Sequence, residues 1–180
     1  MDSKASIRTR LLAQRDSLPT EQVARESKQI CDNLKAFLSL DKPRSILLYA
    51  PIRNEVDPFY LLAWLRENHI TVCLPSIQSD SIVPLVYDPN EPLIRGSFGI
   101  NEPSHRLIHP TPCEIIVVPC IAVDKSHYRL GYGKGFYDRY LNSNSISIGL
   151  AYSFQVLESF PHEPHDQPLS SIVTHNEVLQ

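Results

Sequence analysis

The chain has 180 residues and a formal net charge of -3, with 17 lysine and arginine residues against 20 aspartate and glutamate residues. This length suits a single domain over residues 1–180, since domains usually hold about 100–200 residues. The acidic balance, without a basic stripe, disfavours a nucleic-acid partner. No apolar run approaches the ~18 residues of a membrane span, and no apolar signal segment opens the chain. We therefore expect a cytoplasmic protein that does not associate with a membrane.

Two helices are expected at the start of the chain. Residues 3–17 carry apolar side chains at helical spacing, and Lys4 and Arg8, four positions apart, project from the same side. Surface cations are most often a solvated edge. The alternative is an N-terminal arm whose paired cations contact a polyphosphate. Residues 20–38 form a second amphipathic helix with a structural role.

Apolar runs predict a sheet. Residues 114–119 are the most hydrophobic run, which indicates the centre of the sheet. Pro75 is expected to end one strand, whereas Pro84 indicates that its strand lies at an edge. The predicted strands are residues 45–50, 70–74, 82–87, 114–119, 145–151 and 171–174.

Short helices and loops are expected between these strands. Asp57 followed by Pro58 predicts a helix start, which leaves Glu55 in a strand-to-helix loop, where α/β sheets often build ligand sites. Further short helices are predicted at residues 135–141 and 153–160.

Residues 88–112 are rich in proline and carry few periodic signals, so we expect a long loop of the kind used for lids or binding. Phe98 lies between glycines in this loop, where it can stack on a flat ligand or anchor the loop by packing. Both interpretations remain open.

Several residues that resemble reactive or metal sites are interpreted as structural. The four cysteines show no C-x-x-C spacing, and we expect buried, reduced thiols. Cys120 follows the central strand but has no adjoining histidine motif, so a structural role is preferred. Residues 161–166 hold two histidines between prolines, which disfavours a tetrahedral zinc site and favours a surface turn.

The most concentrated signal lies in residues 129–141. Glycines let the backbone approach a ligand closely, and successive N–H groups leading into a helix form an anion site. The segment matches neither common nucleotide-binding fingerprint. Three of the six glycines are found there, namely Gly131, Gly133 and Gly135.

Charged and aromatic side chains accompany these glycines. Lys134 and Arg129 can hold a phosphate, and Asp138 suits Mg²⁺, which takes one or two carboxylates with phosphate oxygens. Tyr132, Phe136 and Tyr137 offer aromatic faces to a planar group. The segment predicts an ATP-dependent enzyme that acts on an aromatic heterocycle; the alternative is a glycine-rich turn whose aromatic rings belong to the core.

The sequence Arg129-Leu-Gly-Tyr-Gly-Lys-Gly-Phe-Tyr-Asp138 closely resembles the signature of the 5-formyltetrahydrofolate cyclo-ligase family. Other matches occur in the same order along the chain. Lys4-Ala-Ser-Ile-Arg8 resembles an ATP-contacting element, Asn54-Glu-Val-Asp57 resembles the loop after the first strand, and Val118-Pro119 with Asp124-Lys125 resembles the approach to the signature.

The resemblance implies a three-layer, Rossmann-like α/β sandwich with a mainly parallel central sheet, similar to the NagB/RpiA/CoA-transferase-like fold. It also implies conversion of 5-formyltetrahydrofolate and ATP to 5,10-methenyltetrahydrofolate, ADP and phosphate, with Mg²⁺, through phosphorylation of the formyl oxygen. Small molecules are then the only expected partners, and the chain is expected to act as a monomer.

Site residues follow from the same resemblance. Lys134, Arg129 and Glu55 are expected to be catalytic, and Asp138 is expected to bind the metal. The folate is expected to contact Ala50, Glu55, Phe98, Tyr132 and Phe136. The residues implied to bind ATP are Lys4, Ala5, Ser6, Ile7, Arg8, Arg129, Leu130, Gly131, Tyr132, Gly133, Lys134, Gly135, Phe136 and Tyr137.

The chain departs from the family pattern at three positions. Tyr132 stands where some relatives carry a basic or small residue, Phe136 where tyrosine is common, and Ser170 where an aspartate is usual. The last departure leaves the second protein ligand of Mg²⁺ open. A non-catalytic folate- or nucleotide-binding protein is therefore kept as the alternative function, and a sugar-phosphate isomerase is a third, supported only by fold analogy.

Overall fold

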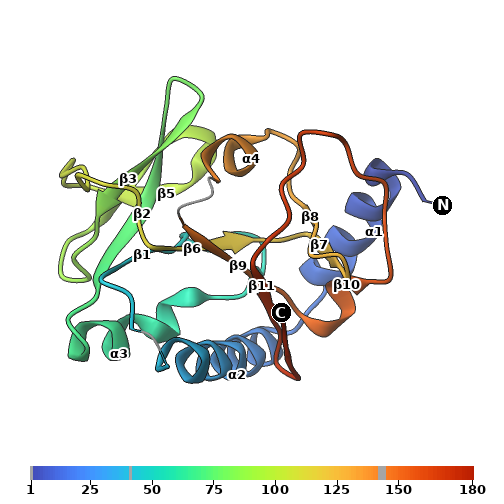
Figure 1. The fold of residues 1–180 in the computed structure, drawn as a ribbon, viewed down its shortest axis with the longest axis horizontal. Coiled ribbons are helices and arrows are strands. Elements are labelled where there is room, and N and C mark those ends of the chain that lie inside the picture. Colours follow the sequence, from blue (N-terminus) through green and yellow to red (C-terminus); the bar gives the residue numbers. More distant parts are fainter. Residues whose placement is uncertain (1, 41, 142–144) are drawn as a thin grey trace.

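The computed structural model describes residues 2–40, 42–141 and 145–180, and its centre is a seven-stranded sheet in the order β12-β11-β9-β6-β1-β2-β3 (Figure 1). Neighbours among β1, β2, β6, β9 and β11 are parallel, while β3 and β12 pair antiparallel at the two edges. The strands are β1 (Ser45–Leu47), β2 (Thr71–Gln78), β3 (Ser81–Val86), β6 (Ile115–Pro119), β9 (Ile146–Leu150), β11 (Ser171–Val173) and β12 (Val178–Leu179).

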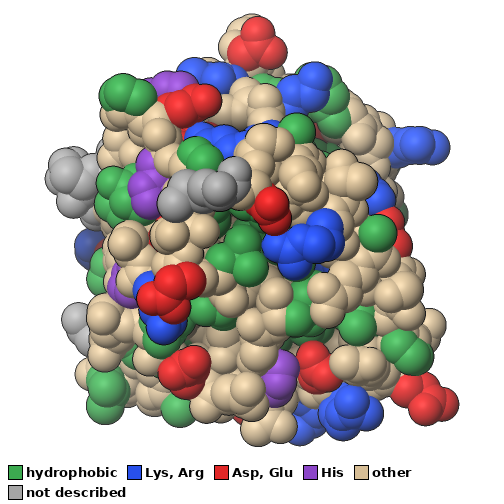
Figure 2. All heavy atoms as spheres, turned by 90° about the vertical axis from the view of Figure 1, so that its right-hand side faces the viewer, with side chains coloured by type: hydrophobic (Ala, Val, Ile, Leu, Met, Phe, Trp, Pro, Cys, Tyr) green, Lys and Arg blue, Asp and Glu red, His purple; other side chains and the backbone are tan. Residues whose placement is uncertain are grey.

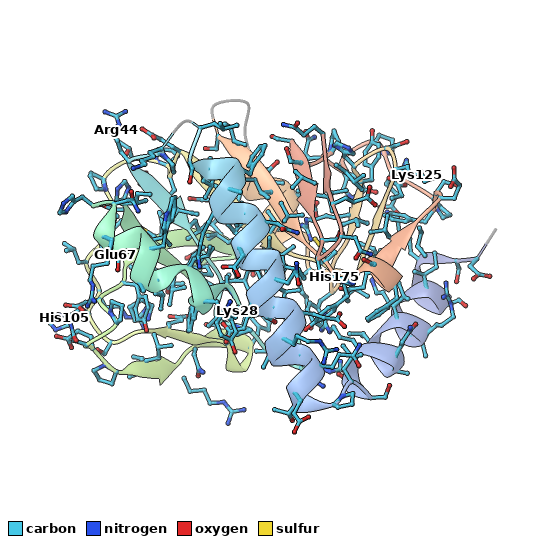
Figure 3. All side chains as sticks on the ribbon, turned by 90° about the horizontal axis from the view of Figure 1, so that it is seen from below. Lys28, Arg44, Glu67, His105, Lys125 and His175 are labelled. Atoms are coloured by element: carbon cyan, nitrogen blue, oxygen red, sulfur yellow. The ribbon has the colours of Figure 1, made fainter. Side chains whose placement is uncertain are left out.

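Helices cover one face of this sheet more fully than the other. On one face α2 crosses the strands beside α3, with Lys28 on its outer side (Figures 1 and 3). On the other face the short helix α4 packs with loops and small strands (Figure 1). The predicted α/β fold around a mainly parallel sheet is confirmed. The helices are α1 (Lys4–Asp16), α2 (Thr20–Leu38), α3 (Leu62–Glu67) and α4 (Phe136–Tyr140), with 3-10 turns η1 (Pro58–Leu61), η2 (Ser97–Gly99) and η3 (Ser153–Gln155).

The central strand is β6, as its hydrophobicity predicted. All of its residues but the last are buried, because parallel strands in the middle of a sheet are covered on both faces. One core lies between the sheet and α2, and includes Ile30, Leu34 and Val117. A second core lies on the α4 face and includes Cys73 and Ile116. These two cores hold the strand ends in place around the site.

The N-terminal helix α1 packs against a small sheet of β7 (Ala122–Asp124), β8 (Arg129–Leu130) and β10 (Val156–Leu157). The Ser3 side chain caps α1 by accepting a hydrogen bond of 3.2 Å from the Ser6 N–H. Ile7 and Leu11 are buried against Leu130 of the small sheet. This packing brings the first turn of α1 next to the segment that follows β8.

One strand prediction was wrong because Pro75 does not end β2. Pro75 lies opposite Pro84 of β3 in the antiparallel ladder. At Pro84 and Val86 the backbone of β3 forms hydrogen bonds on the side away from β2. Val86 N–H donates to Leu107 O over 2.8 Å, and Pro84 O accepts from His109 N–H over 2.9 Å. The two prolines therefore form a non-hydrogen-bonded pair, where a missing N–H costs no ladder bond. The prediction that Pro84 marks an edge strand is confirmed.

Three further differences concern short pairings. The predicted loop 88–112 contains a hairpin of β4 (Leu93–Arg95) and β5 (Asn101–Pro103). Residues 153–160 form only one 3-10 turn before the strand β10, and β12 extends the sheet beyond the last predicted strand. Pairings of two or three residues carry little local signal, because their stability comes from distant partners.

Among the described residues, no helix is both long and apolar enough to cross a membrane. On the side of the molecule at the right of Figure 1, lysine and arginine side chains are interspersed with acidic ones (Figure 2).

Candidate active site

A cavity of about 910 Å³ opens between the first turn of α1, the glycine segment, β2, β3 and the hairpin loop at Phe98. This volume lies within the usual range for small-molecule sites. Every residue that the sequence implied for ATP, folate or metal lines the cavity except Ser6 and Ile7. Ser6 is exposed to solvent, and Ile7 is buried in the core, because only Lys4, Ala5 and Arg8 lie on the helix face toward the cavity.

The glycine segment forms one wall of the cavity in a conformation that requires glycine. Gly133 and Gly135 have φ angles of 86° and 68°, in the left-handed region that L side chains rarely adopt. Arg8 reaches this wall from α1, and its Nε donates a hydrogen bond of 2.8 Å to Gly131 O. A Cβ at Gly133 would lie 3.5 Å from the Arg8 guanidinium. Arg8 and the segment, 123 residues apart, thus form a continuous surface.

Carboxylates pair with two cations of the cavity. Lys4 Nζ lies 2.6 Å from Asp166 Oδ2 and 3.8 Å from Glu163. Arg129 Nη2 lies 3.1 Å from Asp138 Oδ1, and only 5% of the Arg129 side chain is exposed. Burial raises the pKa of Asp166, whereas the hydrogen bonds from Lys4 and from the Glu163 N–H lower it. The hydrogen bonds together have the larger effect, so the pKa of Asp166 lies below its ordinary value. Asp166 is therefore ionised at neutral pH.

The segment around Asp166 is more than the surface turn that the sequence predicted. Glu163, His165 and Asp166 all line the cavity, and a ligand atom of each lies within 4.8 Å of the others. The sequence could not indicate that these groups belong to the site, because Asp166 and its partner Lys4 are 162 residues apart along the chain.

Glu55 lies at the inner end of the cavity and is 5% exposed. Its Oε2 accepts a hydrogen bond of 3.0 Å from Ile52 N–H, and its Oε1 accepts one of 3.1 Å from the Tyr132 hydroxyl. Burial raises the pKa of Glu55, whereas nearby Arg15 lowers it, and burial is the stronger effect. The side chain is held in one orientation by groups from three different parts of the chain.

Arg15 is a further residue of the site, for which the sequence indicated no role. Its guanidinium is 1% exposed and lies 3.7 Å from the Glu55 carboxylate. It also donates hydrogen bonds to Tyr132 Oη over 2.6 Å and to the Arg53 and Cys120 carbonyls. One signal was available: Ile7, Leu11 and Arg15 share one stripe of α1, and a charged residue that continues an apolar stripe needs buried partners.

Phe98 is 61% exposed and lines the cavity. Its ring centroid lies 5.4 Å from that of Phe136, and Lys134 Nζ lies 5.6 Å from the Phe98 ring. Phe98 itself has a φ angle of 57°, which is uncommon for an aromatic residue. Phe98 thus packs against Phe136 and leaves a large aromatic surface accessible, so both roles proposed from the sequence fit its position.

The cysteines are free and buried, as expected. Cys120 is near the cavity, but burial raises the pKa of its thiol to about 12. The thiolate needed for a nucleophile is therefore scarce at neutral pH, which supports the structural interpretation.

Comparisons with known proteins agree with the geometry. The sequence model of the "5-formyltetrahydrofolate cyclo-ligase family" matches residues 1–175. The chain is 34% identical to the 5-formyltetrahydrofolate cyclo-ligase of Mycoplasma genitalium, over 96% of this chain and 98% of the relative. It is similar to the solved 5,10-methenyltetrahydrofolate synthetase of Aquifex aeolicus, with a TM-score of 0.85 and 35% identity, over 97% of this chain and 91% of that one. The corresponding Mycoplasma pneumoniae structure has a TM-score of 0.77 and 30% identity, over 97% and 99% of the two chains.

Proposed function

The chain belongs to the 5-formyltetrahydrofolate cyclo-ligase family, and on that basis we propose how its cavity converts 5-formyltetrahydrofolate to 5,10-methenyltetrahydrofolate. The relatives are named as enzymes, which favours catalysis over a role as a binding protein. One observation carries the proposal: Lys4 and Arg8 of α1, the glycine segment and Glu55 line a single cavity. We call the cations Lys4, Arg8 and Arg129 the cationic end of this cavity, for a polyphosphate, and the rings of Phe98 and Phe136 its aromatic end, for a planar ring. Lys134, whose Nζ lies 5.6 Å from the Phe98 ring, joins the two.

ATP is the co-substrate in this proposal, and its phosphates occupy the cationic end. Lys4, Arg8, Arg129 and Lys134 provide positive charge there, and the N–H groups of the glycine segment approach the phosphate oxygens. Arg129 is held by Asp138, so its guanidinium is oriented before the ligand arrives. Charges that are already fixed in this way stabilise the transferred phosphoryl group without any rearrangement of the protein during the reaction.

Mg²⁺ is the metal that we propose for this cavity, because of its carboxylate oxygens. Asp138 and Asp166 both line it and supply hard carboxylate oxygens, the ligands that Mg²⁺ prefers. We propose that these two residues hold the ion; Asp166 would then take the place left open by Ser170. When bound, the ion supplies positive charge to the phosphate oxygens.

The folate occupies the aromatic end of the cavity. Phe98 and Phe136 offer faces to the pterin ring, and Ala50 and Glu55 also line the cavity. Glu55 orients the formyl group and the neighbouring amine nitrogen of the folate. Tyr132 and Arg15 fix the Glu55 carboxylate for this role.

The reaction then follows in two steps. The formyl oxygen attacks the γ-phosphorus of ATP, the bond to ADP breaks, and the oxygen becomes part of a phosphate leaving group. The neighbouring amine nitrogen attacks the formyl carbon and gives up its proton, the carbon–oxygen bond breaks, and the phosphate leaves with that proton as the ring closes. The protein contributes positioning and charge neutralisation. Action as a cytoplasmic monomer stays a prediction from the sequence.

The test is a spectroscopic assay of methenyltetrahydrofolate formation by the pure protein. We expect product from 5-formyltetrahydrofolate only when both ATP and Mg²⁺ are present, with ADP and phosphate released in equal amounts. A protein that binds the folate tightly by calorimetry but forms no ATP-dependent product contradicts the proposal and supports the binding-protein alternative.

A further inference from the structure

A second group of ligating side chains lies away from the active-site cavity. Cys73, His109 and Cys113 each offer one ligand atom, and these atoms all lie within 4.8 Å of one another. None of the three residues lines the cavity described above. From the sequence, the cysteines are expected only to be buried thiols, and no role is indicated for His109.

Strand pairing explains why these residues meet. Cys73 of β2 lies opposite Val86 of β3, and His109 N–H donates to the carbonyl of Pro84, two residues from Val86. Two residues that lie opposite each other in neighbouring strands point to the same face of a sheet, and so do two residues that are two positions apart in one strand. His109 therefore lies on the same face of the sheet as Cys73. Cys113 precedes β6 and belongs to the same core cluster as Cys73.

The geometry of the group suits a metal. Cys73 and Cys113 are buried, and His109 is half-buried beside them. His109 Nδ1 lies 2.6 Å from the Thr111 carbonyl oxygen. A proton on Nδ1 donates to that carbonyl and leaves Nε2 with a free lone pair, which is the usual arrangement of a metal-ligating histidine.

A buried polar atom without a partner belongs to the same part of the core. Tyr140, at the end of α4, packs against the core cluster that contains Cys73 and Cys113. Its hydroxyl is buried and has no hydrogen-bond partner within residues 2–40, 42–141 and 145–180. A buried hydroxyl without a partner is costly, so a group that binds at this place would relieve it.

We propose that Cys73, His109 and Cys113 form a zinc site distinct from the active site, with the Tyr140 hydroxyl directed to a ligand in the fourth position. Two thiolates and an imidazole match zinc, whereas Mg²⁺ prefers oxygen ligands. The ion joins β2, the segment after β3 and the segment before β6. Because it binds only the folded chain, it stabilises the fold on which α4 rests.

The test measures metal binding by the full-length protein, purified under reducing conditions. Zinc is titrated in competition with a chromogenic chelator, and cobalt is used as a spectroscopic probe. We expect the wild type to bind zinc, to melt at a higher temperature in its presence, and to show a sulfur-to-cobalt charge-transfer band. Cys113→Ser and His109→Gln should weaken zinc binding by at least about tenfold, as loss of one ligand or its support does in other sites.

Two controls separate this site from other groups. Cys31→Ser removes a buried thiol outside the group, and Asp166→Asn removes a carboxylate of the active site; both should keep the cobalt band. His109→Gln alters a half-buried side chain, so it keeps the test decisive if a cysteine variant does not fold. The proposal is overturned if the wild type lacks the sulfur-to-cobalt band, or if His109→Gln and Cys113→Ser bind zinc as well as the wild type.

Discussion

Arg15 Nη2 donates a hydrogen bond of 2.6 Å to the Tyr132 hydroxyl, and that hydroxyl donates in turn to Glu55 over 3.1 Å. This relay links the last turn of α1 with the glycine segment and the loop after β1. It allows a buried cation and a buried carboxylate to lie 3.7 Å apart with a shared partner. The geometry of Glu55 is thus set in part by Arg15, which does not line the cavity.

Tyr132→Phe tests the relay. The variant keeps the ring but leaves Glu55 and Arg15 without their shared partner, and a hydrogen bond to a charged group contributes about 1.5–3 kcal/mol. We expect kcat/KM for 5-formyltetrahydrofolate to fall roughly tenfold to hundredfold, since about 1.4 kcal/mol corresponds to tenfold. Steady-state kinetics provide the measurement, with Tyr60→Phe as a control at an exposed tyrosine. Equal kinetics for Tyr132→Phe and the wild type would refute the positioning role.

Lys134→Ala tests the phosphate end of the cavity. The side chain is exposed, so its removal should leave the fold and the melting temperature unchanged. Loss of its charge at the transferred phosphoryl group should abolish turnover. Lys125→Ala is the matched control, because Lys125 lies at the periphery of the molecule, paired with Glu158 (Figure 3). Unchanged activity in Lys134→Ala would show that another cation performs this role.

Glu55→Gln tests the electrostatic state of the inner wall. Burial raises the pKa of Glu55 above its ordinary value of 4.5, so the folded protein holds the proton more tightly than the unfolded chain. Ionisation of Glu55 therefore lowers the free energy of unfolding as the pH rises from 4.5 through the raised pKa. The variant cannot ionise there, and we expect it to be more stable than the wild type at neutral pH but nearly inactive.

Thermal melts across the acidic and neutral range check this prediction. The stability gain of Glu55→Gln should shrink as the pH falls toward 4.5, where the wild-type carboxyl becomes protonated in both states. Glu158→Gln, at an exposed position, should follow the wild-type profile. A melting temperature for Glu55→Gln below that of the wild type at neutral pH would mean that the pairing with Arg15 outweighs burial.

Gly133→Ala tests the backbone of the glycine segment. An L residue in the left-handed region costs about 1–2 kcal/mol, and the new Cβ would also contact the Arg8 guanidinium. We expect KM for ATP to rise with a smaller change in KM for the folate, because the altered backbone faces the phosphates. Parallel titrations of both substrates measure the difference. An equal rise in both constants would indicate a general disturbance of the cavity.

Local signals accounted for much of the fold. The bounds of α2 agree with the predicted helix, because an apolar stripe at helical spacing runs through the whole segment. The centre of the sheet and the short helix α4 were also predicted, from a continuous apolar run and from the glycines before it. These features depend on residues that are close together along the chain, so they can be predicted from the sequence alone.

The residue types that the site needs can be read from the amino-acid sequence: glycines at positive φ angles, the cations beside them, and a carboxylate after the first strand. How these residues meet depends on the folded chain. It buried Arg15 beside Glu55, paired Lys4 with Asp166, and gathered Cys73, His109 and Cys113 on one face of the sheet. The physical reason is that a helix is stabilised mainly within a few residues, whereas an ion pair or a strand pairing is decided by partners that only the folded chain brings together.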